Sequence, residues 1–249
     1  MPITLNRYRF QSPEDPDLRR AAGDWEKGVN RQQKRLVRNY DQWSVAVRKE
    51  LDRAIKRGAS EVELGAIVDR ASASLEAGLV KICNEGTKQA AKISAGERVG
   101  IPSIVSRIDK QIQINNTLVS EALMPSVKDR LGKKIIPGMD KKALKGAFDS
   151  LRGMPASYAG GYWTMIFETQ RDLGKNKERE RRGEGLEPEP IYWVLDKAAN
   201  NCEDCLAYAG EYPSWDDLPT VPAGAVRCKG NCRCHLETYV DGKWQRGVY

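Results

Sequence analysis

The sequence has little of what several large protein classes require. No apolar run approaches the roughly 18 residues of a membrane-spanning helix, so we expect no membrane span. Residues 1–7 lack the apolar segment of a secretory signal, and we therefore expect synthesis in the cytoplasm. A glycine-rich phosphate loop of the Walker type is also missing, which argues against a nucleoside-triphosphate site of that kind.

Histidine occurs only once in the sequence, at His235, directly after a group of cysteines. A Ser-His-Asp or Cys-His catalytic centre would need this histidine to be free of the neighbouring thiols. No constellation of aspartate and glutamate stands out as an alternative acid–base site. We therefore predict that the protein is not an enzyme and takes no small-molecule substrate.

Five of the six cysteines fall within one short segment near the C-terminus. They are Cys202, Cys205, Cys228, Cys232 and Cys234. The first two form a C-x-x-C pair, whose thiolates can face one metal ion because the backbone turns between them. Zinc takes four such ligands in a tetrahedron, so five thiols compete for four places. This surplus predicts a closed, structural zinc site, since a catalytic zinc keeps one position open for water.

Two other interpretations of these cysteines stay open. They could form disulfides, although the sequence gives no sign of an oxidising compartment. They could include a thioredoxin-type redox pair, but no βαβ pattern surrounds the C-x-x-C. The 22 residues between Cys205 and Cys228 slightly exceed the common two-knuckle zinc spacing. The sixth cysteine, Cys83, is expected to be a small buried apolar side chain.

Charge is distributed unevenly along the chain, whose net charge is +7. Residues 183–249 carry 6 basic and 11 acidic residues, a net charge of −5. Residues 1–182 carry 35 basic and 23 acidic residues, a net charge of +12. A basic first part could meet nucleic acid or an acidic protein surface, or it could be a solvated helical surface.

The first part of the chain is predicted to be helical. An apolar stripe at steps of three and four runs from Leu36 to Ile55, and a second runs from Leu64 to Ile82. Gly58 is expected to end the first helix, and Ser60 with Glu63 forms a capping box for the second. Two such helices with a short break predict an antiparallel helical hairpin.

Glycine and proline mark the later breaks. Gly86, Gly96 and the segment 100–102 are expected to interrupt the helices, and Ser103 and Asp140 to begin new ones. Pro125 is expected at a kink or in a first turn, and 114–117 is the weakest helical stretch. Pro155 is expected to begin a last long helix.

That last helix ends in a basic run. Its members are Lys175, Lys177, Arg179, Arg181 and Arg182. Such a run at a helix end can contact nucleic-acid phosphates, and it can equally be a solvated terminus that matches the helix dipole. Residues 183–190 follow as an acidic, proline-rich linker.

The C-terminal part is predicted to be a small α+β unit. Residues 191–195 have the composition of a strand, and Asp241-Gly242 between two apolar-aromatic runs predicts a β-hairpin. We therefore predict a mainly α protein with four parts: a tail (1–16), a basic amphipathic helical body (17–182), a linker (183–190) and a metal-stapled, Cys-rich module (191–249). The metal would replace apolar burial that so small a module lacks.

The order of features between Met154 and Leu236 resembles the phage minor head protein family, the Mu F-like head morphogenesis proteins. A long helix with Glu168-Thr-Gln170 precedes a strand that ends at Asp196, and the C-x-x-C of Cys202 follows. Leu206 and Gly210, the loop at Pro219 and Pro222, and Cys232-Arg-Cys234 complete the order. Two features depart from the family pattern. Cys228 stands near the place of a usual histidine, and an Arg-Thr-Glu-like segment reads Glu-Thr-Gln.

The resemblance implies a low-copy structural protein of the virion, bound to the portal or capsid proteins. Family members act in head morphogenesis, and DNA packaging or ejection is the further role implied, with non-specific contact to packaged DNA. An alternative from another class is a zinc-ribbon nucleic-acid-binding protein. The acidic charge of the Cys-rich part speaks against this alternative, because a zinc reader normally carries its basic residues on the metal module.

Overall fold

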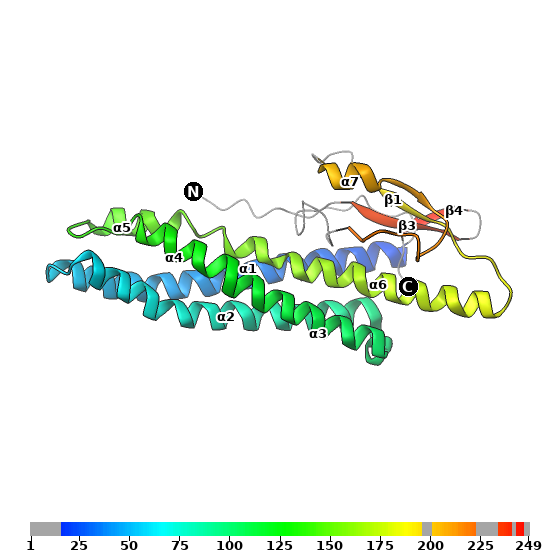
Figure 1. Cartoon of the computed structure of the whole chain (residues 1–249), viewed down its shortest axis with the longest axis horizontal. Helices are drawn as coiled ribbons and strands as arrows, with labels where there is room; N and C mark the ends of the chain where they lie inside the picture. The colour runs from blue at the N-terminus through cyan, green and yellow to red at the C-terminus, as the bar shows by residue number, and fades with distance from the viewer. Residues whose placement is uncertain (1–15, 196–200, 223–233, 241–242, 247–249) are drawn as a thin grey trace. The chain divides into compact units, whose positions relative to one another are not determined.

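The computed structural model of the chain describes residues 16–195, 201–222, 234–240 and 243–246. The predicted tail therefore lies almost wholly outside the described residues, and so do Asp196, Cys228 and Cys232. The described chain is mainly helical with one small antiparallel sheet, as predicted (Figure 1). Within these ranges no helix combines the length and the apolar character needed to cross a membrane.

The chain forms two compact units. Among the described residues, unit 1 consists of 31–85 and 112–159, and unit 2 consists of 16–30, 86–111 and the part that begins at 160. Each unit has its own apolar core. The sheet therefore shares a unit with helical segments of the predicted body. Separate folding of 191–249 stays a prediction.

Unit 1 is built on the predicted helical hairpin. Helix α1 (Pro16–Lys56) ends before Gly58, which adopts a positive φ of 79°, and α2 (Glu61–Ala95) begins after the capping box. The Glu63 carboxylate accepts a hydrogen bond of 2.8 Å from the backbone amide of Ser60. In return, the Ser60 hydroxyl accepts one of 3.4 Å from the backbone amide of Glu63. The indole of Trp43 donates to the carbonyl of Ala71 at 2.9 Å, which joins the two helices. Both predicted caps and the hairpin are confirmed.

Shorter helices complete unit 1. Helix α3 (Pro102–Thr117) belongs to unit 1 only from residue 112 onward. It continues into a π-helix, η2 (Leu118–Leu123), and then into α4 (Met124–Gly132), with Pro125 in its first turn. Helix α5 (Lys141–Asp149) is capped by Asp140, whose carboxylate accepts the Ala143 amide at 2.7 Å. The hydroxyl of Tyr40 donates to the carbonyl of Phe148 at 2.8 Å, which ties α5 to α1. Cys83 is buried, as expected.

Three predicted helix boundaries differ from the structure. Gly86 lies buried inside α2, because packing of that helix outweighs the roughly 1 kcal/mol cost of an interior glycine. Helix α2 ends only before Gly96, where the short 3-10 helix η1 (Gly96–Gly100) begins. Pro102, and not Ser103, opens α3, which suits the preference of proline for the first helical position. Pro155 begins a 3-10 helix, η3 (Pro155–Ala159), ahead of α6 (Gly160–Gly183).

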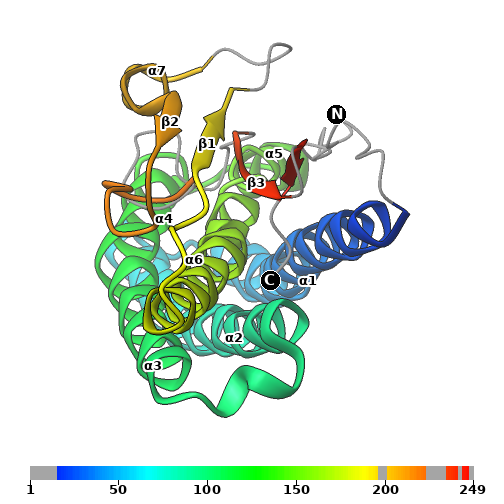
Figure 2. The same ribbon diagram turned by 90° about the vertical axis from the view of Figure 1, so that its right-hand side faces the viewer.

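Unit 2 packs α6 beside the sheet (Figures 1 and 2). The sheet has the order β2-β1-β3-β4, with β1 (Ile191–Val194), β2 (Gly210–Tyr212), β3 (His235–Val240) and β4 (Lys243–Arg246). All three pairings are antiparallel. The strand at 191–195 and the hairpin are confirmed, while β2 and the short helix α7 (Glu203–Tyr208) were not predicted.

Alternation along the strands puts one sheet face into the core of unit 2. Ile191 and Trp193 of β1 are fully buried, whereas Tyr192 between them is exposed. Trp193 stands opposite Leu236 of β3, and both belong to the apolar cluster that contains Trp163 and Phe167 of α6. These aromatic side chains place the Cys-rich segment and α6 around one core.

Candidate functional site

The structure describes three of the five clustered cysteines, and all three belong to the core of unit 2. Cys202 precedes the first turn of α7, Cys205 lies within that helix, and Cys234 directly precedes β3. Cys205 and Cys234 are buried, and Cys202 packs against the same apolar cluster. The Cys234 thiol lies 3.5 Å from the side-chain oxygen of Asn201. The fold thus draws both ends of the predicted metal site into one core.

These three thiols do not form a metal site by themselves. Across the described ranges, no group of three or more histidine, cysteine, aspartate or glutamate side chains is arranged to hold a metal ion. A four-thiolate zinc site would therefore need Cys228 or Cys232, both of which lie in the undescribed segment 223–233. Zinc binding stays a prediction, and α7 together with the start of β3 would supply its described ligands.

His235 is engaged beside this site. Its side chain is buried at the start of β3, and its Nε2 lies 2.8 Å from a carboxylate oxygen of Glu237. The two residues are two apart on one strand, so their side chains share a face of the sheet. The carboxylate thus fixes the ring beside Cys234.

The basic run of α6 is largely paired with acidic groups. Lys175 contacts Asp216 at 2.7 Å, Lys177 contacts Glu189 at 3.1 Å, Arg181 contacts Glu189 at 3.3 Å and Arg182 contacts Glu178 at 2.7 Å. The hydrogen bond from Lys175 lowers the pKa of Asp216, and the positive charges of Arg182 and Arg179 lower it further. Among the five predicted nucleic-acid contacts, only the Arg179 guanidinium has no ion pair with a described residue. DNA contact by this run stays a prediction.

One face of α6 instead holds the segment 214–218. The buried carboxylate of Glu178 accepts the backbone amide of Trp215 at 3.1 Å, and Arg171 donates to the carbonyl of Leu218 at 2.6 Å. The indole of Trp215 covers Gly174, where a β-carbon would lie 2.6 Å from Cδ2 of the ring. Glycine therefore permits the close approach, which no local sequence pattern reveals because the two positions lie 41 apart along the chain.

A second charged group on α6 was also missed. Arg107 of α3 binds Asp172 through two hydrogen bonds of 3.0 and 3.2 Å, and it lies 3.3 Å from Glu168. The two carboxylates are only 15% and 10% exposed. The hydrogen bond from Arg107 to Asp172 raises the pKa of the guanidinium, and the negative charges of Glu168 and Asp172 raise it further. The sequence signal for this group was the spacing of Glu168 and Asp172, because residues four apart on a helix lie on the same face.

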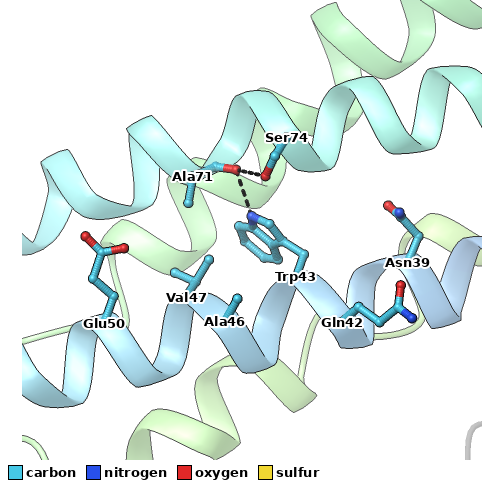
Figure 3. A pocket seen from close by; sticks show the side chains of 8 residues that line it. All are labelled: Asn39, Gln42, Trp43, Ala46, Val47, Glu50, Ala71 and Ser74. Atoms are coloured by element: carbon cyan, nitrogen blue, oxygen red, sulfur yellow. Dashed lines mark hydrogen bonds between the residues drawn. The ribbon is translucent and has the colours of Figure 1, made fainter.

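Unit 1 contains a cavity of about 300 Å³ between α1 and α2, shown in Figure 3. The Ala71 carbonyl at its edge accepts from the Trp43 indole and from the Ser74 hydroxyl, at 2.9 and 2.8 Å. Glu50 is the one ionisable side chain among the eight that line this cavity, and it pairs with Arg70 at 2.5 Å. The lining thus offers hydrogen bonds to a ligand but no acid–base pair.

Comparison of the chain with protein-family models, with curated proteins and with solved structures finds no match in any of the three.

Proposed function

We propose that this protein is a structural minor head protein of a tailed phage, bound to portal or capsid proteins, with a structural zinc site in its Cys-rich part. The observation that carries the proposal is the order of features from Met154 to Leu236 that resembles the Mu F-like family. The proposal places the protein in the virion at low copy number. Its proposed role is head morphogenesis, with DNA packaging or ejection as the further role.

The arrangement of these features in unit 2 supports a structural role for the cysteines. A long helix, α6, is followed by β1, then by α7 with Cys202 and Cys205, and then by Cys234 at the start of β3. Buried thiols at the junction of a short helix and a small sheet suit a staple that holds these elements together. A zinc ion there would fix α7 against β3.

The segment that departs from the family pattern is packed inside unit 2. Glu168 lies beside Arg107, and Thr169 and Gln170 are buried on α6. In this chain, the Glu-Thr-Gln segment therefore supports a packing function of α6, in keeping with a protein that acts as a structural part.

The pairing of the basic run weakens the alternative of a zinc-ribbon nucleic-acid-binding protein. Such a protein would present basic side chains near its metal site, whereas Asp216, Glu178 and Glu189 engage four of the five basic residues at the end of α6. The +12 charge of residues 1–182 still suits a protein that faces packaged DNA.

Particle composition tests the proposal. The chain would be produced together with the head proteins encoded beside it, and density-purified particles would be analysed by quantitative mass spectrometry. We expect the protein at a low, fixed copy number per particle, and much less of the variant that carries Cys202→Ser and Cys205→Ser. A wild-type chain that stays entirely outside the particles would overturn the proposal.

A further inference from the structure

An open pocket of about 460 Å³ lies in unit 2, between η1 and the C-terminal half of α6. Its lining combines charged or polar side chains with an apolar floor. The charged or polar members are Arg98, Asn176, Lys177, Arg179 and Glu180, and the floor is Ile101 and Leu173. This face of α6 is distinct from the face that holds Trp215, because residues 173, 176, 177 and 180 follow a separate helical stripe.

Two guanidiniums in this pocket are available to a ligand. Arg98 and Arg179 are exposed, and neither side chain forms a hydrogen bond or ion pair with any residue in the described ranges. The charge of Arg179 is the smallest of the effects that lower the pKa of Asp216, and the main partner of that carboxylate is Lys175. Lys177 already forms an ion pair, since its ammonium lies 3.1 Å from a carboxylate oxygen of Glu189. Glu180 is the one carboxylate in the lining, so positive charge prevails.

We propose that this pocket binds a phosphate of the DNA backbone, with Arg98 and Arg179 as the two main contacts. The planar guanidinium matches the geometry of phosphate oxygens and binds them through paired, charge-assisted hydrogen bonds. Arg98 comes from η1 and Arg179 from α6, so an anion between them joins two segments that lie 81 residues apart in the sequence.

The surroundings of the pocket favour a polymer of phosphates over a single anion. Lys88 and Lys92 are exposed on α2, ten and six residues before Arg98 in the sequence. Residues 86–111 carry five basic and two acidic residues, and only Arg107 among the five basic ones is already paired with described residues, Asp172 and Glu168. A polyanion gains from such neighbouring charges through the release of its counterions, whereas one inorganic phosphate does not. Half-buried Ile101 offers an apolar surface for the sugar that follows the phosphate, above the buried Leu173.

This inference rests on the proposed role beside packaged DNA, and it is tested by the affinity of the full chain for a short duplex DNA in fluorescence anisotropy. The variant with Arg98→Ala and Arg179→Ala should bind roughly tenfold more weakly or worse, because two charged hydrogen-bond donors are lost. Its plot of log affinity against log salt should be shallower by about 1.8, the value for two phosphate contacts. Glu180→Gln should strengthen binding, since it removes the one repulsive charge.

The matched control carries Arg38→Ala and Arg53→Ala. Both arginines are exposed on α1 in unit 1, and the double change removes the same charge. We expect less than about a threefold loss of affinity from a change outside the site. An equal loss in both double variants, or no DNA binding by the wild-type chain at 50 mM salt, would overturn the site.

Titration with inorganic phosphate separates the two sources of the anion. Binding of phosphate without any binding of the duplex would overturn the assignment to DNA. The particle measurement stays separate, because the double variant at Arg98 and Arg179 should still enter particles at the wild-type level. Loss of the wild-type chain from particles would instead contradict the proposed function.

Discussion

The contact between Gly174 and Trp215 gives the sharpest test of how the C-terminal part is held. Replacing an interior helical glycine with alanine ordinarily stabilises a helix by up to about 1 kcal/mol. In α6, however, the new methyl group would lie 2.6 Å from Cδ2 of the Trp215 ring, a separation at which one of the groups must move. The substitution Gly174→Ala should therefore destabilise the protein.

The size of the loss follows from how firmly Trp215 is fixed. Trp215 is 3% exposed and its backbone amide donates to the Glu178 carboxylate at 3.1 Å, so the ring has little room to shift. Forcing an extra methyl group into a packed core costs about 1–3 kcal/mol, and losing the packing of a tryptophan altogether costs about 3–5 kcal/mol. Because the ring has little room to shift, we take the upper part of the overpacking range, about 2–3 kcal/mol. Subtracting a helical gain of about 1 kcal/mol leaves an expected decrease of about 1–2 kcal/mol in the free energy of unfolding.

The assay is urea unfolding followed by circular dichroism and tryptophan fluorescence. Gly183→Ala is the matched control, because it is the same substitution in the same helix and its new β-carbon would have no heavy atom within 4 Å. We expect this control to be neutral or slightly stabilising. In a Trp215→Ala background, Gly174→Ala should also lose its penalty, since the two residues act through one contact. Equal effects of the two glycine substitutions in the wild-type background would refute the packing of Trp215 on α6.

Three further predictions concern thiols and charges. Burial raises the pKa of the Cys83 thiol to about 12, so iodoacetamide at pH 8 should label Cys83 only after unfolding. Rapid labelling of the folded protein, measured by peptide mass spectrometry, would contradict the burial of this thiol. Lys175 lowers the pKa of Asp216, so this pair stabilises the fold above the ordinary aspartate pKa and the contribution is lost as the pH falls through the lowered value. Lys175→Met should therefore weaken the acid dependence of unfolding, and an unchanged pH profile would argue against the pair. The double change Cys202→Ser and Cys205→Ser should leave far-UV helix content nearly unchanged, because no described residue beyond Ala159 belongs to the core of unit 1. Proteolysis after Pro190 should increase, since zinc binding would hold the Cys-rich part in its fold. Loss of most of the helical signal would contradict this prediction.

Local chemistry made much of the fold predictable. The apolar stripes, the capping box at Ser60 and the cap at Asp140 each involve residues within a few positions of one another, and all appear in the structure. The Asp-Gly hairpin is likewise a short-range signal, and β3 pairs with β4 across it. The prediction of a break at Gly86 was wrong, because a glycine that is buried inside α2 has the same local sequence signal as one that ends a helix.

The candidate sites, too, were predictable only where their residues lie close together in the sequence. The cysteines stand close together in the sequence, so their grouping was visible from spacing alone. The ion pair of Lys175 with Asp216 and the pocket that unites Arg98 with Arg179 join residues 41 and 81 positions apart. Composition shows that such charges exist, but only the packing of α6 decides which are neutralised within the chain and which face solvent.

The central claim is that the Cys-rich segment is a structural metal centre, and the metal content of the purified chain tests it most directly. Protein prepared without chelators would be analysed for zinc by elemental mass spectrometry, and its thiols would be mapped by peptide mass spectrometry. We predict about one zinc ion per chain, as four thiolate ligands imply, and loss of that zinc in the variant with Cys202→Ser and Cys205→Ser. A metal-free wild-type chain with disulfide-linked cysteine peptides would contradict the account.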